Sequence, residues 1–228
     1  MKNLFLFCVA LLVSCFAQLE VITSKSEGKS GFFFGAGIGV AANMMRFVGQ
    51  SHPVTGSFYD KKQTYAALVL SAKVGGYYAF TNLIALRYYY NLDFNLNPTG
   101  GESEPNSPIE TFYLLSGSHT LNTDAIVSVF ASKDFKVDVL AGMGMGLLAG
   151  EYGPRYKTVY KPADRSNFID FEFRFNLGTR VMFAQKYGIE LMMKLPVTPA
   201  VYVYGSDASR YSKFAPYYFT LDFVMERF

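Results

Sequence analysis

The stretch from Ile169 to Phe183 alternates strictly between two kinds of side chain, and it limits the possible folds more than any other part of the chain. One set of alternate positions is aromatic or aliphatic except for a threonine, while the other set carries the charges, from Asp170 to Arg180. Successive side chains of a β-strand point to opposite faces, whereas a helix would scatter them around its surface. The stretch therefore predicts a long strand, which exceeds the roughly 9–11 residues that a tilted transmembrane strand needs.

The same alternation recurs in seven other parts of the chain. The additional predicted strands are 31–45, 64–79, 84–96, 121–131, 136–149, 188–195 and 217–228. The start of the strand at 121–131 is the least defined, because residues 112–115 either extend it or fold over the preceding loop. Together with the first stretch, these segments predict eight strands. A content of 22 Phe and 17 Tyr agrees with this, because aromatic residues favour strands.

The predicted connections alternate between long and short. Long segments rich in glycine, proline and polar residues are 46–62, 97–108, 150–167 and 196–214. An even number of strands with every second connection long is typical of bacterial outer-membrane barrels, whose short turns face the periplasm and whose long loops face outwards. We therefore predict an all-β fold: a closed, eight-stranded, antiparallel, up-and-down transmembrane β-barrel. It would lie in the cell outer membrane with both termini periplasmic.

The N-terminal segment has the pattern of a secretory signal. A short basic start precedes the apolar run from Leu4 to Val13, which is too short to span a membrane, and small residues follow up to Ala17. We predict a signal peptide at 1–17, a flexible periplasmic lead at 18–30 and a barrel at 31–228. In a second interpretation, the residues that end at Cys15 are a lipobox, and Cys15 is the residue that becomes lipidated. Cleavage after Ala17 would leave no cysteine, and therefore neither a disulfide nor a thiolate metal site.

The volume of the lumen indicates which face points inwards. An eight-stranded barrel has an interior only just wide enough for side chains. The apolar face is too bulky for that space, whereas the other face mixes glycines with charges of both signs, which pair when they are buried. We therefore predict a polar interior and a lipid-facing apolar exterior. The predicted interior charges are Lys73, Arg87, Asp93, Asp138, Asp170, Glu172, Arg174, Arg180, Glu190, Lys194 and Asp222.

Several stretches in the second half of the chain carry a resemblance to a known family. They are Leu121 to Ala125, a turn ending in Asp134-Phe135, the glycine-alternating 139–146, Tyr187 to Glu190, Lys194-Leu195-Pro196 and an aromatic last strand ending in Phe228. Over residues 120–228 the chain resembles the Helicobacter outer membrane protein family, which includes adhesins and porins. The resemblance implies a small, barrel-only member. The role of the large adhesins is not implied, because this chain has no room for their exported head.

Phe228 is the expected signal for the barrel-assembly machinery, but it departs from the usual pattern. It does not share the apolar parity of the last strand, which runs from Tyr217 to Met225. Either a bulge lies near Met225 and Glu226, or the assembly signal is weak.

Three functions remain open from the sequence. The first is a non-enzymatic structural or surface-interaction protein with four extracellular loops, the second a narrow porin-like channel, and the third a lipid A-modifying enzyme. The only candidate catalytic constellation for the third is Ser118, His119 and Asp124. The sequence predicts no cofactor and no metal, because its two histidines are far apart.

The expected partners follow from the barrel and its loops. They are the outer-membrane bilayer, lipopolysaccharide, the barrel-assembly machinery and a host surface ligand. Basic residues of one long connection are candidates for contact with lipopolysaccharide phosphates or a host anion: Arg155, Lys157, Lys161 and Arg165. A net charge of only +3 does not indicate a nucleic-acid partner.

Overall fold

The computed structural model describes residues 29–51, 58–97, 109–132, 134–156, 166–184, 186–203 and 211–227. Its strands are β1 (Lys29–Ser51), β2 (Phe58–Ala79), β3 (Ile84–Asn97), β4 (Ile109–Ala131), β5 (Phe135–Tyr156), β6 (Ser166–Phe183), β7 (Tyr187–Pro196), β8 (Ala200–Val203) and β9 (Tyr211–Arg227). Among these residues no helix is long and apolar enough to cross a membrane. The predicted signal peptide, Cys15 and Phe228 lie outside them. So does the predicted lead, except Lys29 and Ser30, which begin β1.

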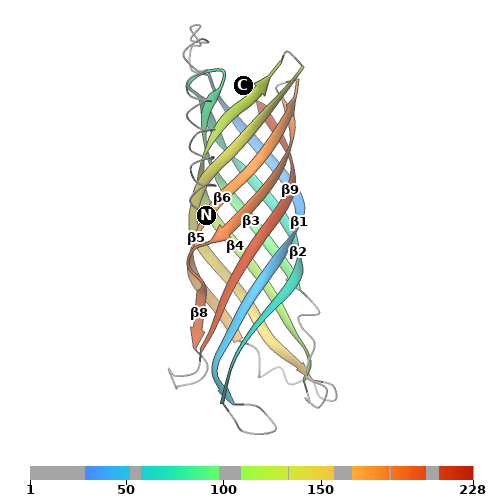
Figure 1. Cartoon of the computed structure of the whole chain (residues 1–228), viewed down its shortest axis with the longest axis vertical. Coiled ribbons are helices and arrows are strands. Elements are labelled where there is room, and N and C mark those ends of the chain that lie inside the picture. Colours follow the sequence, from blue (N-terminus) through green and yellow to red (C-terminus); the bar gives the residue numbers. More distant parts are fainter. Residues whose placement is uncertain are drawn as a thin grey trace, which may run out of the picture.

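The strands form one closed antiparallel sheet (Figure 1). Neighbours in sequence pair with each other, and β1 also pairs with β9, which closes the cylinder. β7 and β8 together act as one wall strand, because both pair with β9 on the same side and are separated only by residues 197–199. The wall therefore consists of eight strands, and the predicted up-and-down barrel is confirmed.

The strands are strongly staggered around the barrel. A path of directly paired residues begins at Gly31 in β1, crosses every strand and returns to β1 at Ala41, ten residues further along. Such a stagger makes the strands tilt, by roughly 35–45° in barrels of this size. The tilt is plain in Figure 1. It also brings residues from distant parts of the sequence to the same level of the lumen.

The two ends of the barrel differ. One end, here called the turn end, carries the short connections at 80–83, 132–134 and 184–186. The first residues of β1 and the last of β9 lie at this end, since Lys29 pairs with Ala79 and the amide of Glu226 donates to the carbonyl of Lys186 at 2.8 Å. The other end, the loop end, carries the long connections. Both ends of the described chain thus lie on one side.

At the loop end the strands are longer than the sequence predicts. Three predicted loops are partly strand: β1 and β2 extend into 46–62, β5 and β6 into 150–167, and β8 and β9 into 196–214. Residues 112–115 belong to β4, which settles its undefined start. Of the two explanations offered for Phe228, the bulge near Met225 and Glu226 is not found, because the register of β9 with β1 is unbroken from Arg227 to Tyr211.

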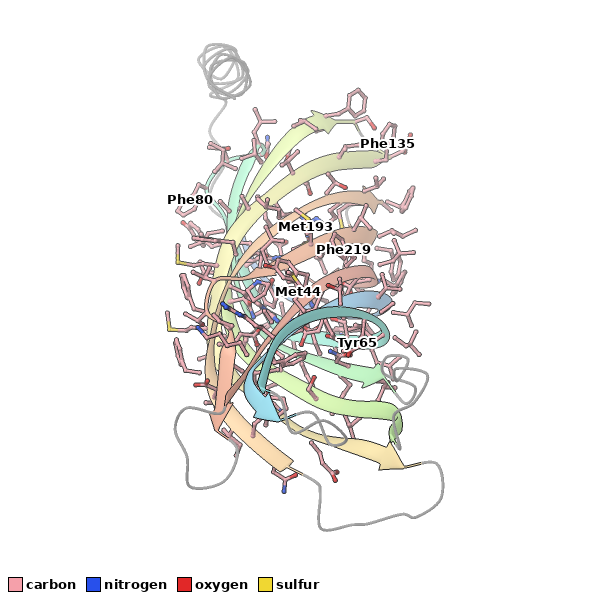
Figure 2. All side chains as sticks on the ribbon, turned by 60° about the horizontal axis from the view of Figure 1, so that its bottom comes forward. Met44, Tyr65, Phe80, Phe135, Met193 and Phe219 are labelled. Carbon is pink, nitrogen blue, oxygen red and sulfur yellow. The ribbon has the colours of Figure 1, made fainter. Side chains whose placement is uncertain are left out.

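The two faces of the wall differ in chemistry as well. The outward face is apolar and exposed, with side chains such as Phe32, Ile169 and Leu191 more than half exposed. Figure 2 shows side chains projecting outwards all round the barrel, with Phe80 and Phe135 near the turn end. Tyr77 is an exception near the turn end, because its side chain points inwards and is 5% exposed. A surface of this kind suits hydrocarbon rather than water.

Inward-facing glycines make room for this lumen, and one of them provides a test of the orientation. A Cβ at Gly142 would collide with the side chain of Asp124 and the carbonyl of Thr123. Gly142→Val should therefore cost about 1–3 kcal/mol of unfolding free energy, measured by urea unfolding in lipid vesicles. The outward-facing control Ala72→Val should change stability little. On a water-facing strand surface valine would instead stabilise the protein, so a more stable Gly142→Val would contradict this orientation.

Candidate functional site

The middle of the lumen holds a cluster of five buried charges, here called the central cluster: Lys73, Arg87, Asp124, Glu190 and Asp222. The Nζ of Lys73 lies 2.8 Å from Asp222 and 3.2 Å from Glu190. Arg87 contacts Glu190 at 2.7 Å and Asp124 at 2.8 Å. Each cation thus contacts two carboxylates, and each contact is close enough for a charge-assisted hydrogen bond.

Neutral donors add hydrogen bonds to the carboxylates, which outnumber the cations in the central cluster. The Tyr89 hydroxyl donates to Asp124 at 2.9 Å, and the Asn176 amide donates to the other oxygen of Asp124 at 3.1 Å. The Thr220 hydroxyl donates to Asp222 at 2.9 Å. These bonds are necessary because a buried charge without partners would cost several kcal/mol.

A second group, the loop-side cluster, lies nearer the loop end and consists of Asp93, Glu172, Arg174 and Lys194. Lys194 contacts one oxygen of Asp93 at 2.5 Å, and Arg174 contacts the other at 2.9 Å. Arg174 also lies 3.2 Å from the Ser118 hydroxyl, which in turn donates to Glu172. The four charges of this cluster balance one another.

A third group lies close to the short turns. Arg180 donates to Asp138 through Nε at 2.9 Å and through Nη2 at 2.8 Å, and it also pairs with Glu226. Lys136 approaches Asp138 at 3.5 Å and is about a quarter exposed, so this group is the one that reaches water. The charges are therefore arranged in three levels along the barrel axis.

Two of the ion pairs cross the full width of the lumen. β3 and β7 lie four strands apart in either direction around the barrel. Nevertheless Arg87 on β3 contacts Glu190 on β7, and Lys194 on β7 contacts Asp93 on β3. The lumen is therefore filled by side chains at these two levels.

Apolar side chains lie next to the central and loop-side clusters. Beside the central cluster, Ala85, Ile126, Leu140 and Met192 form a buried cluster, and the sulfur of Met192 lies 3.9 Å from Arg87. Towards the loop end, Phe168 and Phe214 are buried with their ring centroids 5.7 Å apart. The central and loop-side clusters are thus enclosed in a low-dielectric environment, where charge pairing is strong.

The structure buries ten of the eleven predicted interior charges, and the eleventh, Asp170, is partly exposed near the loop end. Sequence reasoning missed two further interior carboxylates. Asp124 was assigned to the catalytic constellation, although it shares its parity with the other polar residues of its strand. Glu226 shares the parity of Asp222, so continuing the alternation to the end of the last strand would have found it.

The candidate catalytic constellation is not assembled. Ser118 faces the lumen, where its hydroxyl contacts Glu172 and Arg174, and Asp124 contacts Arg87. His119 points outwards, as neighbours on a strand must, and its Nδ1 lies 2.5 Å from the Tyr90 hydroxyl. The three candidate residues therefore do not converge.

The basic residues that are predicted to contact lipopolysaccharide or a host anion lie where the structure describes no side chains. Lys157, Lys161 and Arg165 lie outside the described residues, and only the backbone of Arg155 is described, at the end of β5. Within the described part of the chain no group of three or more histidine, cysteine, aspartate or glutamate side chains is placed to hold a metal ion.

The ion pair across the lumen predicts a large effect of a small substitution. Glu190→Gln keeps the shape of the side chain but leaves Arg87 and Lys73 each with one carboxylate, which should cost about 3–5 kcal/mol of unfolding free energy. Urea unfolding in vesicles measures this cost. The matched control Asp170→Asn, at the partly exposed position, should cost less than about 1 kcal/mol. Equal stabilities of the two variants would contradict the structural role of this pair.

Comparisons with known proteins give one family match. A model described as Helicobacter outer membrane protein matches residues 71–225, more than half of the chain. Among curated proteins, none matches.

Solved structures give distant likenesses. Ail, the attachment invasion locus protein of Yersinia pestis, has a TM-score of 0.42 at 10% identity, covering 86% of this chain and 99% of that one. Neisserial surface protein A has a TM-score of 0.46 at 10% identity, covering 88% and 99%. The outer membrane protease OmpT of Escherichia coli has a TM-score of 0.35 at 7% identity, covering 86% and 97%. With TM-scores below 0.5, these likenesses say nothing about function, and the fold rests on the strand pairing itself.

Proposed function

The chain belongs to the Helicobacter outer membrane protein family, and on that premise we propose that this outer-membrane barrel is non-enzymatic and acts as a structural or surface-interaction protein. Its four long connections face the cell exterior, and both ends of the chain face the periplasm. The turn end, which carries the short connections, is then the periplasmic end.

The observation that carries this proposal is the length of the strands at the loop end. β5 has 22 residues and β4 has 23, whereas about 9–11 residues suffice to span a bilayer. At about 3.3 Å per residue and a tilt near 40°, the excess projects roughly 28–35 Å beyond the hydrocarbon. Projecting hairpins add nothing to membrane anchoring, and they present backbone and loops to the surroundings.

Within the described residues, parts of the projecting hairpins pair with a neighbouring strand on one side only. β3 ends at Asn97, so its partners pair with it only over part of their length. Within the described residues, 58–67 of β2 pair only with β1, and 109–113 of β4 pair only with β5. Free edges of this kind accept an extended segment of another protein. They are therefore suited to a protein partner at the cell surface.

The basic connection after β5 suits an anionic partner. Lys157, Lys161 and Arg165 follow Arg155 within ten residues, in the connection between β5 and β6. Lipopolysaccharide phosphates and sulfated host sugars share the chemistry that such a group attracts.

The narrow channel is the alternative function, and the ion pairs count against it. A solute would have to break both contacts that cross the lumen between β3 and β7 and displace the apolar side chains next to them. No feature of the described lumen favours conduction over a sealed interior.

Cysteine labelling on intact cells tests the proposed orientation. The barrel segment contains no cysteine, so a single one can be introduced at Ser103 in a long connection or at Asn82 in a short turn. We expect a membrane-impermeant maleimide to label Ser103→Cys, and to label Asn82→Cys only after the outer membrane is permeabilised. Labelling of Asn82→Cys alone on intact cells would invert the proposed orientation.

Heparin retention tests the anionic interaction. Three exposed ion pairs contribute about 1.5 kcal/mol together, so replacing Lys157, Lys161 and Arg165 with serine should weaken binding of intact cells to heparin beads about tenfold. The control replaces Glu102 and Glu104 of another long connection with serine and should not weaken binding. The wild-type interaction should also decline as salt rises. Unchanged retention of the basic-loop variant would refute this part of the proposal.

A further inference from the structure

The outer wall of the barrel carries a groove of about 790 Å³ over β2 to β5. Its floor forms where bulky lipid-facing side chains give way to smaller ones: Thr123, Ala125 and Ala141 all face outwards, and the two alanines are direct partners across β4 and β5. Tyr88 and Met143 flank the floor. The volume lies within the range of small-molecule sites in proteins, roughly 300–1,000 Å³.

A polar pair adjoins this apolar groove. Tyr90 is part of the groove wall, and its hydroxyl lies 2.5 Å from Nδ1 of His119 on the neighbouring strand. With the tyrosine donating to Nδ1, the ring proton of a neutral histidine is on Nε2. Among the described residues no hydrogen bond reaches Nε2, and the missing side chain of Gly117, whose Cβ would lie 3.7 Å away, leaves space beside it. A hydrogen-bond donor is therefore available at one end of the groove.

The pair of Tyr90 and His119 lies at the height expected for the membrane boundary on the side of the loop end. Ten residues of β4 separate His119 from the outward-facing Val129 near the turn end. At about 3.3 Å per residue and a tilt near 40°, this corresponds to about 25 Å, the height of the apolar band of such barrels. The groove floor, at Thr123 and Ala125, lies between these levels. The donor thus lies at the headgroup level of the loop-end leaflet, and the groove lies at acyl-chain depth.

We propose that the groove and the pair of Tyr90 and His119 form a binding site for one phosphorylated, acylated glycolipid of the outer leaflet, lipid A of lipopolysaccharide. One acyl chain lies along Thr123, Ala125 and Ala141, and a phosphate oxygen accepts a hydrogen bond from Nε2 of His119. The head at the loop end selects the outer leaflet, given the orientation proposed above. A phospholipid of the inner leaflet would place its head at the turn end, away from the pair.

Native mass spectrometry in detergent, with bis-phosphorylated hexa-acyl lipid A as the probe, tests this site. We expect one tightly bound lipid A on the wild type. Ala141→Phe fills the floor and should weaken binding at least tenfold, whereas Ala36→Phe, an outward-facing change on β1, should not. His119→Phe removes the donor and should weaken binding of phosphorylated lipid A about tenfold without affecting the dephosphorylated form. Heat-modifiable gel mobility confirms that each variant is folded.

Four outcomes would overturn the site. They are equal binding by Ala141→Phe and Ala36→Phe, equal loss of both lipid A forms in His119→Phe, equally tight binding of phosphatidylethanolamine, and a protein dimer that Ala141→Phe abolishes. The last would assign the groove to a second copy of the chain. Because binding in detergent is independent of topology, failure here is distinguishable from failure of the cysteine-labelling experiment.

Discussion

Backbone amides and carbonyls in hydrocarbon have no water to bond, so a sheet that enters a membrane must satisfy all of them itself. In this protein the pairing of β1 with β9 meets that requirement. It runs without interruption from Phe32 and Arg227 to Val48 and Tyr211. Without it both strands would present open edges to lipid, and the remaining features depend on the cylinder that it closes.

Closure creates a lumen whose contents are then restricted by volume. Inward-facing glycines on β1 and β5 leave space for long charged side chains from the other strands. These charges are removed from water by the apolar side chains next to them, so each one needs partners at hydrogen-bond distance. The stagger of ten residues supplies them, because it brings Arg87 and Glu190, or Asp93 and Lys194, to the same level from opposite walls.

The alternation in the sequence predicted the eight wall strands and their faces because, inside the membrane, one face meets lipid and the other a packed interior. Beyond the membrane both faces meet water, so the alternation fades although pairing continues. Arg46 and Lys62, for example, are direct partners in strands where the sequence predicted a loop. Contacts across the lumen were not predictable either, since they depend on the stagger. Nor was the contact of Tyr90 with His119, whose direct partner across the strands is Leu92.

The contacts between β3 and β7 have a consequence for how the chain enters its membrane. Arg87 and Glu190 are 103 residues apart in sequence, so no single hairpin contains both. A hairpin of β3 and β4 that crosses hydrocarbon alone would keep the contact of Arg87 with Asp124 but lose the one with Glu190, and each charge left without its full set of partners costs several kcal/mol. Insertion of one hairpin at a time is therefore disfavoured. The strands are expected to pair into a nearly closed barrel at the bilayer surface before they insert.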